Sequence, residues 1–146
     1  MNSQFYPAIP ERMEKLVQLL REKLGEEFDF IDAFTDEVAA TPIYRPTATV
    51  GIRSMEVRNT WLLDLAGRQD DEDCYGKLVE VIFEVTIHAP VSYGGYICRG
   101  FFCKLRDALN ESDTFRITRI SAGEIAYDRS RRCLCMPIDL QEKYIL

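Results

Sequence analysis

Histidine and long apolar runs are scarce in this sequence of 146 residues. His88 is the single histidine, which excludes a metal or catalytic site built from several imidazoles. No segment approaches the roughly 20 apolar residues of a membrane-spanning helix, and charged side chains interrupt the longest apolar-rich run, Leu78–Pro90. Met1–Pro10 shows neither the basic start nor the apolar stretch of a secretory leader, so we expect a cytosolic protein without membrane contact.

Acidic residues outnumber basic residues: the chain has 24 Asp and Glu and 18 Lys and Arg, which gives a net charge of −6. That balance does not favour the phosphate backbone of nucleic acids as the main partner. The one dense basic cluster, Arg129, Arg131 and Arg132, has the sequence context of a turn. We therefore expect no sequence-specific binding of nucleic acid.

The cysteines are odd in number, and their spacing follows no disulfide framework. They are Cys74, Cys98, Cys103, Cys133 and Cys135. Without an export signal in view, we interpret them as reduced thiols.

What the sequence does contain is ordinary globular composition, with 47% hydrophobic and 29% charged residues. Neither a repeat nor a linker divides the chain, so residues 1–146 are predicted to form one domain with its own core. The pattern predicts an α+β fold in the order α-β-β-α-β-β. Its mainly antiparallel sheet, of about four to five strands, is flanked by two helices.

Two segments show helical periodicity. In Pro10–Leu24, apolar residues recur on one face, the proline suits the first position, and Gly25 is a natural stop. The second helix is predicted over roughly Tyr93–Leu109, although three glycines weaken its first half.

Alternation of apolar and polar residues predicts the strands. It is clearest in Lys77–His88, where one face is wholly apolar. In Thr47–Val57 the apolar face flips near Ser54, which indicates a bulge or a strand end. Phe28–Phe34 is a candidate for an extra short strand.

The C-terminal part is predicted to form a β-hairpin. Phe115–Tyr127 and Arg132–Leu140 are its strands, and Asp128–Arg131 is its turn. Pro137 has no backbone N–H to donate, so the last strand is predicted to be an edge of the sheet.

Cys133 and Cys135 form the most metal-like feature of the sequence. Residues two apart on a strand share a face, so both sulfurs could reach one ion. A tetrahedral zinc site needs about four ligands, so the fold would have to recruit Cys74 or His88. Cysteine also serves as a small buried hydrophobe, and on that interpretation we predict no metal site.

The remaining polar features predict no chemistry. Asp70, Asp71, Glu72 and Asp73 lack the ligand spacing of an EF-hand and are interpreted as a solvated hairpin tip. His88 is interpreted as a polar side chain at a strand end, and neither a phosphate-binding loop nor a GxSxG motif occurs. We therefore predict no catalytic residue, no cofactor and no enzyme activity.

The order of elements resembles the small tail-terminator and tail-completion proteins of long-tailed bacteriophages and prophages. The similar parts cover nearly the whole chain: the helix Pro10–Leu24, ATVGI (Ala48–Ile52), KLVEVIFEVTIHAP (Lys77–Pro90), GFFCKLRDAL (Gly100–Leu109) and ISAGEIAYDRSRRCLCMPIDL (Ile120–Leu140).

This resemblance implies a structural virion assembly protein. Its copies would form a ring, usually a hexamer, that stops tail-tube polymerisation and joins the tail to the head connector. The partners would be other copies, tail-tube proteins and head-connector proteins, first in the bacterial host cytoplasm and then in the tail or neck of the virion. DNA would pass through the channel without sequence recognition.

Charge and position suggest which residues face the channel or a neighbouring subunit. They are the acidic run Asp70, Asp71, Glu72 and Asp73, the expected edge residue Pro137, and the apolar C-terminus Tyr144, Ile145 and Leu146. The C-terminus could equally fold back on its own core.

Three alternatives stay open. The chain could be another neck or minor tail component. It could be a small cytosolic enzyme using cysteine and His88, or a metal-binding domain at Cys133 and Cys135. It could also be a monomeric adaptor or inhibitor that binds one protein through an exposed sheet edge.

Overall fold

The computed structural model describes residues 9–32, 43–61 and 75–145. The described elements are α1 (Ile9–Leu24), β1 (Asp29–Asp32), β2 (Thr47–Trp61), β3 (Tyr75–Pro90), the 3-10 helix η2 (Val91–Tyr93), α4 (Tyr96–Asn110), β4 (Ile117–Ala122), β5 (Ala126–Asp128) and β6 (Cys133–Ile145). The predicted α+β class is confirmed. The sheet has six strands rather than four to five, because β1 joins it and the C-terminal region supplies three strands.

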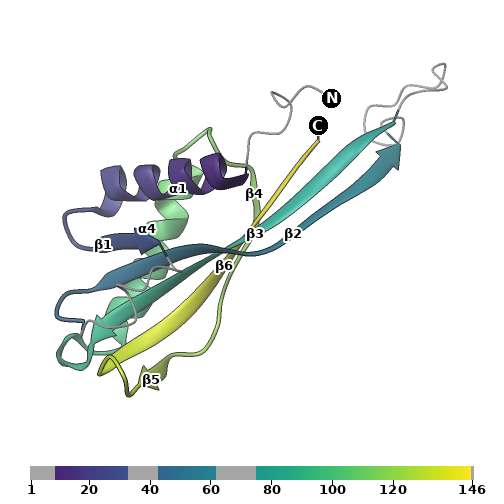
Figure 1. The fold of residues 1–146 in the computed structure, drawn as a ribbon. Helices are drawn as coiled ribbons and strands as arrows, with labels where there is room; N and C mark the ends of the chain where they lie inside the picture. Colours follow the sequence, from purple (N-terminus) through teal and green to yellow (C-terminus); the bar gives the residue numbers. More distant parts are fainter. Residues whose placement is uncertain (1–8, 33–42, 62–74, 146) are drawn as a thin grey trace.

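The strands form one sheet in the order β1-β2-β3-β6-β4, with β5 also paired to β6 (Figure 1). β1 runs parallel to β2, and the other pairings are antiparallel. β3 is central: its pairing with β2 runs from Tyr75 to His88, and its pairing with β6 runs from Leu78 to Pro90.

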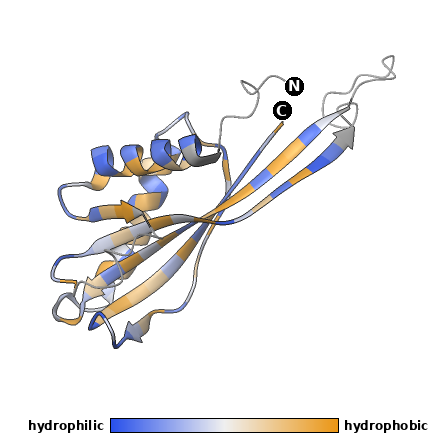
Figure 2. Ribbon diagram, viewed as in Figure 1, coloured by the Kyte–Doolittle hydropathy of each residue, from blue (hydrophilic) through white to orange (hydrophobic). Residues whose placement is uncertain are grey.

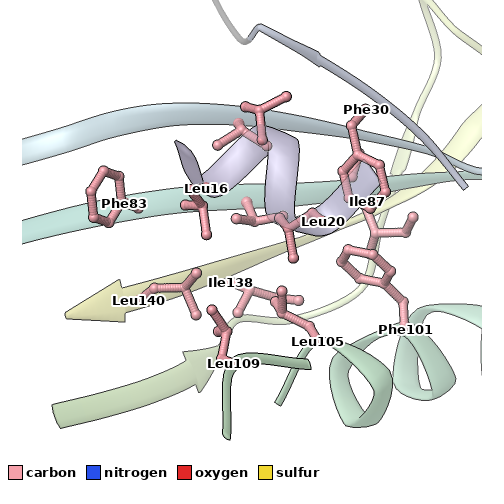
Figure 3. Close-up of a cluster of buried hydrophobic side chains, with 14 of the residues drawn as sticks. Leu16, Leu20, Phe30, Phe83, Ile87, Phe101, Leu105, Leu109, Ile138 and Leu140 are labelled. Atoms are coloured by element: carbon pink, nitrogen blue, oxygen red, sulfur yellow. The ribbon is translucent and has the colours of Figure 1, made fainter. Parts of the chain in front are cut away.

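One face of the sheet packs against the two helices and forms the core (Figure 3). α1 contributes Leu16 and Leu20, which confirms its predicted apolar stripe, and α4 contributes Phe101. These side chains meet Phe83 and Ile87 of β3, and all five are fully buried. Since burying such a side chain contributes about 1.5–3 kcal/mol, this layer supplies most of the hydrophobic stabilisation.

The alternation predicted for β3 is confirmed, and it is visible as alternating bands in Figure 2. The odd-numbered residues from Val79 to Ala89 are buried on the helix-covered face. The even-numbered residues, such as Glu80 and Glu84, point to the opposite face, which no described helix covers.

β2 and β3 continue beyond the helices (Figure 1), and β6 accompanies β3 as far as Leu78, so among the described residues only the pairs from Lys77 to Tyr75 are two-stranded. Of the two alternatives predicted near Ser54, the bulge is present, as a register shift just before this residue, and the strand continues beyond it. Beyond it, Met55 pairs with Val81 and Val57 with Val79, so these residues share the helix-covered face. The β3 partners are buried, whereas Met55 is 57% and Val57 49% exposed.

α4 begins at Tyr96, later than the predicted start at Tyr93. η2 occupies Val91–Tyr93, and Gly94 follows with φ of 76°. Glycine adopts this left-handed conformation without steric cost, and it interrupts helical geometry before α4.

The prediction that the last strand is an edge is wrong, because β6 lies between β3 and the strands β4 and β5. Pro137 pairs with Thr86 on one side, and on the other it faces the gap between β4 and β5. There its carbonyl accepts a hydrogen bond from Gly123 N at 2.8 Å. A central strand tolerates this proline because its missing N–H falls where the neighbouring ladder is interrupted.

Gly123 allows the close approach to Pro137, and we predict that Gly123→Ala destabilises the fold. A Cβ at this position would lie 2.9 Å from Pro137 Cγ, and such overpacking costs about 1–3 kcal/mol. Urea denaturation should show this loss of unfolding free energy.

Gly100→Ala is the matched control. A Cβ on Gly100 would meet nothing within 4 Å, and alanine is favoured over glycine in a helix, so this variant should gain up to about 1 kcal/mol. If Gly123→Ala and Gly100→Ala changed the unfolding free energy equally, contact with Pro137 would not be the cause. Adding Pro137→Ala to Gly123→Ala should recover part of the lost unfolding free energy.

Candidate functional site

The sheet brings the single histidine together with two cysteines and an aspartate. His88 on β3 is paired with Cys135 on β6, and Asp128 on β5 is paired with Cys133 on β6. One potential ligand atom from each of these four residues lies within 4.8 Å of all the others. We call these four residues the histidine–cysteine cluster.

The cluster is compact and largely shielded from solvent. His88 Nδ1 lies 3.1 Å from Cys135 Sγ, and the sulfurs of Cys133 and Cys135 are 3.7 Å apart. Both cysteines are free thiols. His88 is 7% exposed and Cys133 is fully buried, whereas Cys135 and Asp128 are half-buried.

Two neighbours orient the polar groups of the cluster. Thr49 Oγ1 lies 3.3 Å from His88 Nε2, whereas Cys135 lies at the other ring nitrogen. Asp128 Oδ1 accepts hydrogen bonds from Ser130 N at 3.0 Å and from Ser130 Oγ at 2.7 Å. The turn after β5 therefore holds the carboxylate in place.

Burial dominates the protonation of the metal-free cluster. Burial, followed by the positive charge of Arg131, lowers the pKa of His88 to about 4. Burial raises the pKa of Cys135 to about 12 and also raises the pKa of Cys133. The imidazole is then neutral and the thiols are protonated, which is not the thiolate form of a cysteine nucleophile.

The sequence indicates part of this cluster. Cys133 and Cys135 are singled out by their spacing, and the fold does recruit His88 to them. Cys74, the other residue considered for recruitment, lies outside the described residues. The sequence analysis does not identify Asp128. The signal that could have done so is its position just before a hairpin turn, which places it opposite Cys133.

The residues expected to face a channel or a neighbouring subunit are only partly described. Asp70, Asp71, Glu72, Asp73 and Leu146 lie outside the described residues, so the predictions made for them stay predictions.

The other three expected interface residues lie on β6. Pro137 is half-buried inside the sheet. Tyr144 pairs with Val79 and packs against the core, while Ile145 is 44% exposed. Up to Ile145, the C-terminal segment is therefore a strand of the sheet and not a free tail.

β2 offers a candidate assembly surface that sequence reasoning does not single out. β1 pairs only with Thr47–Val50, and within the described ranges no strand borders the outer edge of β2 from Gly51 onward. Met55 and Val57 lie exposed on this stretch. We call residues 51–61 the β2 outer edge.

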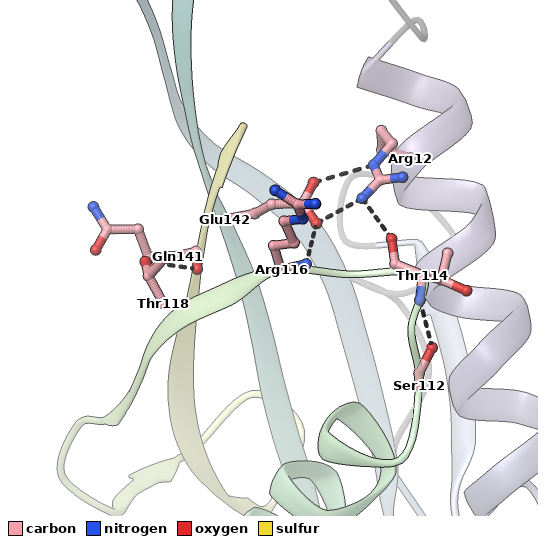
Figure 4. A network of polar contacts seen from close by, with 7 residues as sticks. All are labelled: Arg12, Ser112, Thr114, Arg116, Thr118, Gln141 and Glu142. Carbon is pink, nitrogen blue, oxygen red and sulfur yellow. Dashed lines mark hydrogen bonds and ion pairs between the residues drawn. The ribbon is translucent and has the colours of Figure 1, made fainter. Parts of the chain in front are cut away.

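A buried ion pair joins α1 to β6 (Figure 4). Glu142 is 1% exposed, and Arg12 donates to both of its carboxylate oxygens, at 3.1 and 2.6 Å. Glu142 also accepts from Arg116 N at 3.3 Å, and Arg12 donates to Thr114 O at 3.0 Å. The Arg12 guanidinium lies 4.6 Å from the centre of the Phe115 ring, so these contacts fix the end of β6 beneath α1.

Comparison with known proteins does not assign this chain to a family. No model of a known protein family and no curated protein matches this chain. Within the described residues, neither helix combines the length and apolar content that crossing a membrane requires.

Breaking the Arg12–Glu142 pair should destabilise the fold strongly. Arg12→Met leaves a buried carboxylate without its partner, which costs about 3–5 kcal/mol. Urea denaturation would measure this loss of unfolding free energy.

Two further variants separate the ion pair from general effects. Arg116→Ala should change stability little, because Arg116 reaches Glu142 through its backbone N–H, which alanine keeps. Arg12→Met with Glu142→Leu should recover most of the loss, since the buried charge is then gone. A double variant as unstable as Arg12→Met alone would contradict this account.

Proposed function

We propose that this chain is a structural assembly protein of a long-tailed phage or prophage, of the tail-terminator kind. Its copies form a closed ring, which stops tail-tube polymerisation and joins the tail to the head connector. The α+β architecture, with helices on one face of a mainly antiparallel sheet, agrees with what the resemblance implies.

The β2 outer edge is the observation that carries the proposal. An exposed strand edge presents unpaired N–H and C=O groups, which favour pairing with another chain. Here the edge also carries two large apolar side chains, Met55 at 57% and Val57 at 49% exposure. Covering them would remove apolar surface from water and stabilise the contact.

Of the three charged residues on the β2 outer edge, Glu56 is exposed, and the two arginines pair within the sheet. Arg53 pairs with Asp139 of β6, and Arg58 pairs with Glu80 of β3 at 3.4 Å. Both arginines therefore turn inward across the sheet. Charged side chains that protect an edge would extend outward from it.

A second copy of the chain is the occupant we propose. Among the described strands, the sheet has two different borders: β1 and the β2 outer edge on one side, and β4 and β5 on the other. A contact between different surfaces of identical subunits is heterologous, and it generates a ring when the rotation closes. Tail-tube and head-connector proteins would bind the finished ring, and the acidic run Asp70–Asp73 would face the DNA channel or a neighbouring subunit.

Charge placed on the β2 outer edge should prevent assembly. We expect Met55→Glu with Val57→Glu to shift the protein from a ring of about six subunits to monomers, because buried unpaired carboxylates oppose association. Multi-angle light scattering over a wide concentration range, with negative-stain microscopy, measures the change.

Tyr96→Glu is the matched control, since Tyr96 on α4 is a large hydrophobic residue that is 72% exposed, more than either Met55 or Val57. Its ring should persist. A wild-type protein that stays monomeric at every concentration would contradict the proposal. A two-fold dimer that the edge charges dissociate would instead show that β2 pairs with itself.

A further inference from the structure

We propose that the histidine–cysteine cluster binds a zinc ion and that this ion is structural. The ion would be held by His88 Nδ1, one carboxylate oxygen of Asp128, and the sulfurs of Cys133 and Cys135. This inference is independent of ring formation.

The distances suit tetrahedral zinc. Bonds of about 2.3 Å to sulfur and about 2.0–2.1 Å to nitrogen or oxygen place neighbouring ligand atoms roughly 3.3–3.8 Å apart. The two sulfurs are already 3.7 Å apart, and the 3.1 Å between His88 Nδ1 and Cys135 Sγ requires only a small opening. With all ligand atoms within 4.8 Å of one another, small side-chain adjustments complete the tetrahedron.

The donor types select zinc over the common hard cations. Calcium and magnesium take oxygen ligands, and this cluster offers only one carboxylate. Two thiolates, an imidazole and a carboxylate form a set that suits zinc.

The surroundings prepare the ligands for a metal. If His88 Nε2 carries the proton and donates it to Thr49, Nδ1 is left with its lone pair toward the cysteines. Ser130 occupies Oδ1 of Asp128, which leaves Oδ2 to coordinate the ion. Hydrogen bonds of this kind orient the ligands of known metal sites.

The local charge also agrees with a bound dication. Two thiolates and a carboxylate carry three negative charges, so zinc leaves one negative charge on the site. Arg131 acts electrostatically on all four ligand residues and would offset this charge.

Four protein ligands leave no open position for water or substrate, which is the mark of a structural site. The ion would join three strands, β3, β5 and β6. β5 has only three residues and pairs only with β6 among the described strands, so a bond through Asp128 would secure it. His88 and the β3 residue opposite Met55, Val81, are about 23 Å apart along the strand, so the site lies away from Met55 and Val57.

Metal analysis of the full chain, purified under reducing conditions and incubated with Zn²⁺, tests the proposal. We expect one zinc ion per chain after removal of free metal, and a lower midpoint of thermal unfolding after chelation. Replacing zinc by Co²⁺ should give the visible bands of a tetrahedral cobalt site and the near-ultraviolet charge-transfer band of cobalt–thiolate bonds.

Cys135→Ser should lose both the bound metal and the effect of the chelator. Cys103→Ser is the matched control, because Cys103 is an exposed thiol on α4 outside the cluster, and this variant should keep both. The proposal is overturned if wild-type protein binds no zinc, or if Cys135→Ser binds as much zinc as Cys103→Ser. A Co²⁺ spectrum without thiolate bands would overturn it even if Cys135→Ser failed to fold.

Discussion

The pairing of β3 with both β2 and β6 is the constraint on which the rest of the structure depends. Because side chains alternate along a strand, this one element divides the protein into two faces. Its odd-numbered positions, from Val79 to Ala89, carry the core beneath the helices. Its even-numbered positions place Glu80 among ion pairs and His88 beside the cysteines. Without this register, neither the core nor the histidine–cysteine cluster would assemble.

The two ends of β3 differ in how much of the molecule supports them. At the His88 end, the surrounding elements exclude solvent, and even a histidine is only 7% exposed. Toward Tyr75, β2 runs past the helices with Met55 and Val57 exposed. In this stretch β6 still borders β3 as far as Leu78, whereas the outer edge of β2 has no neighbouring strand among the described residues. Because an open strand edge presents unpaired backbone groups, this part of the sheet gains most from a partner chain.

Periodic patterns in the sequence predict the fold where one physical requirement dominates. Burial of one face explains why α1, β3 and the bulge in β2 could be predicted. The central place of β6 could not be predicted from Pro137, because the gap between β4 and β5 that accommodates the proline depends on tertiary pairing. Similarly, the spacing of Cys133 and Cys135 indicates a shared face, but only the register across β3 and β5 adds His88 and Asp128.

The position of the proposed zinc site bears on how the sheet chooses its register. A slip of one residue between neighbouring strands turns every side chain to the other face. Such a slip of β6 against β3 would move Cys135 away from His88 and would also expose Ile138 and Leu140. Hydrophobic burial alone already opposes a slip of one residue. A slip of two residues keeps each apolar side chain on the same face of the sheet, so burial does not oppose it. Metal coordination does not tolerate it, because Cys135 would then lie about two residues, or roughly 7 Å, from its place opposite His88. A zinc ion would therefore favour the observed register over this two-residue slip, which hydrophobic burial does not exclude. It would act at the end of the sheet where β5 is held by only three residue pairs.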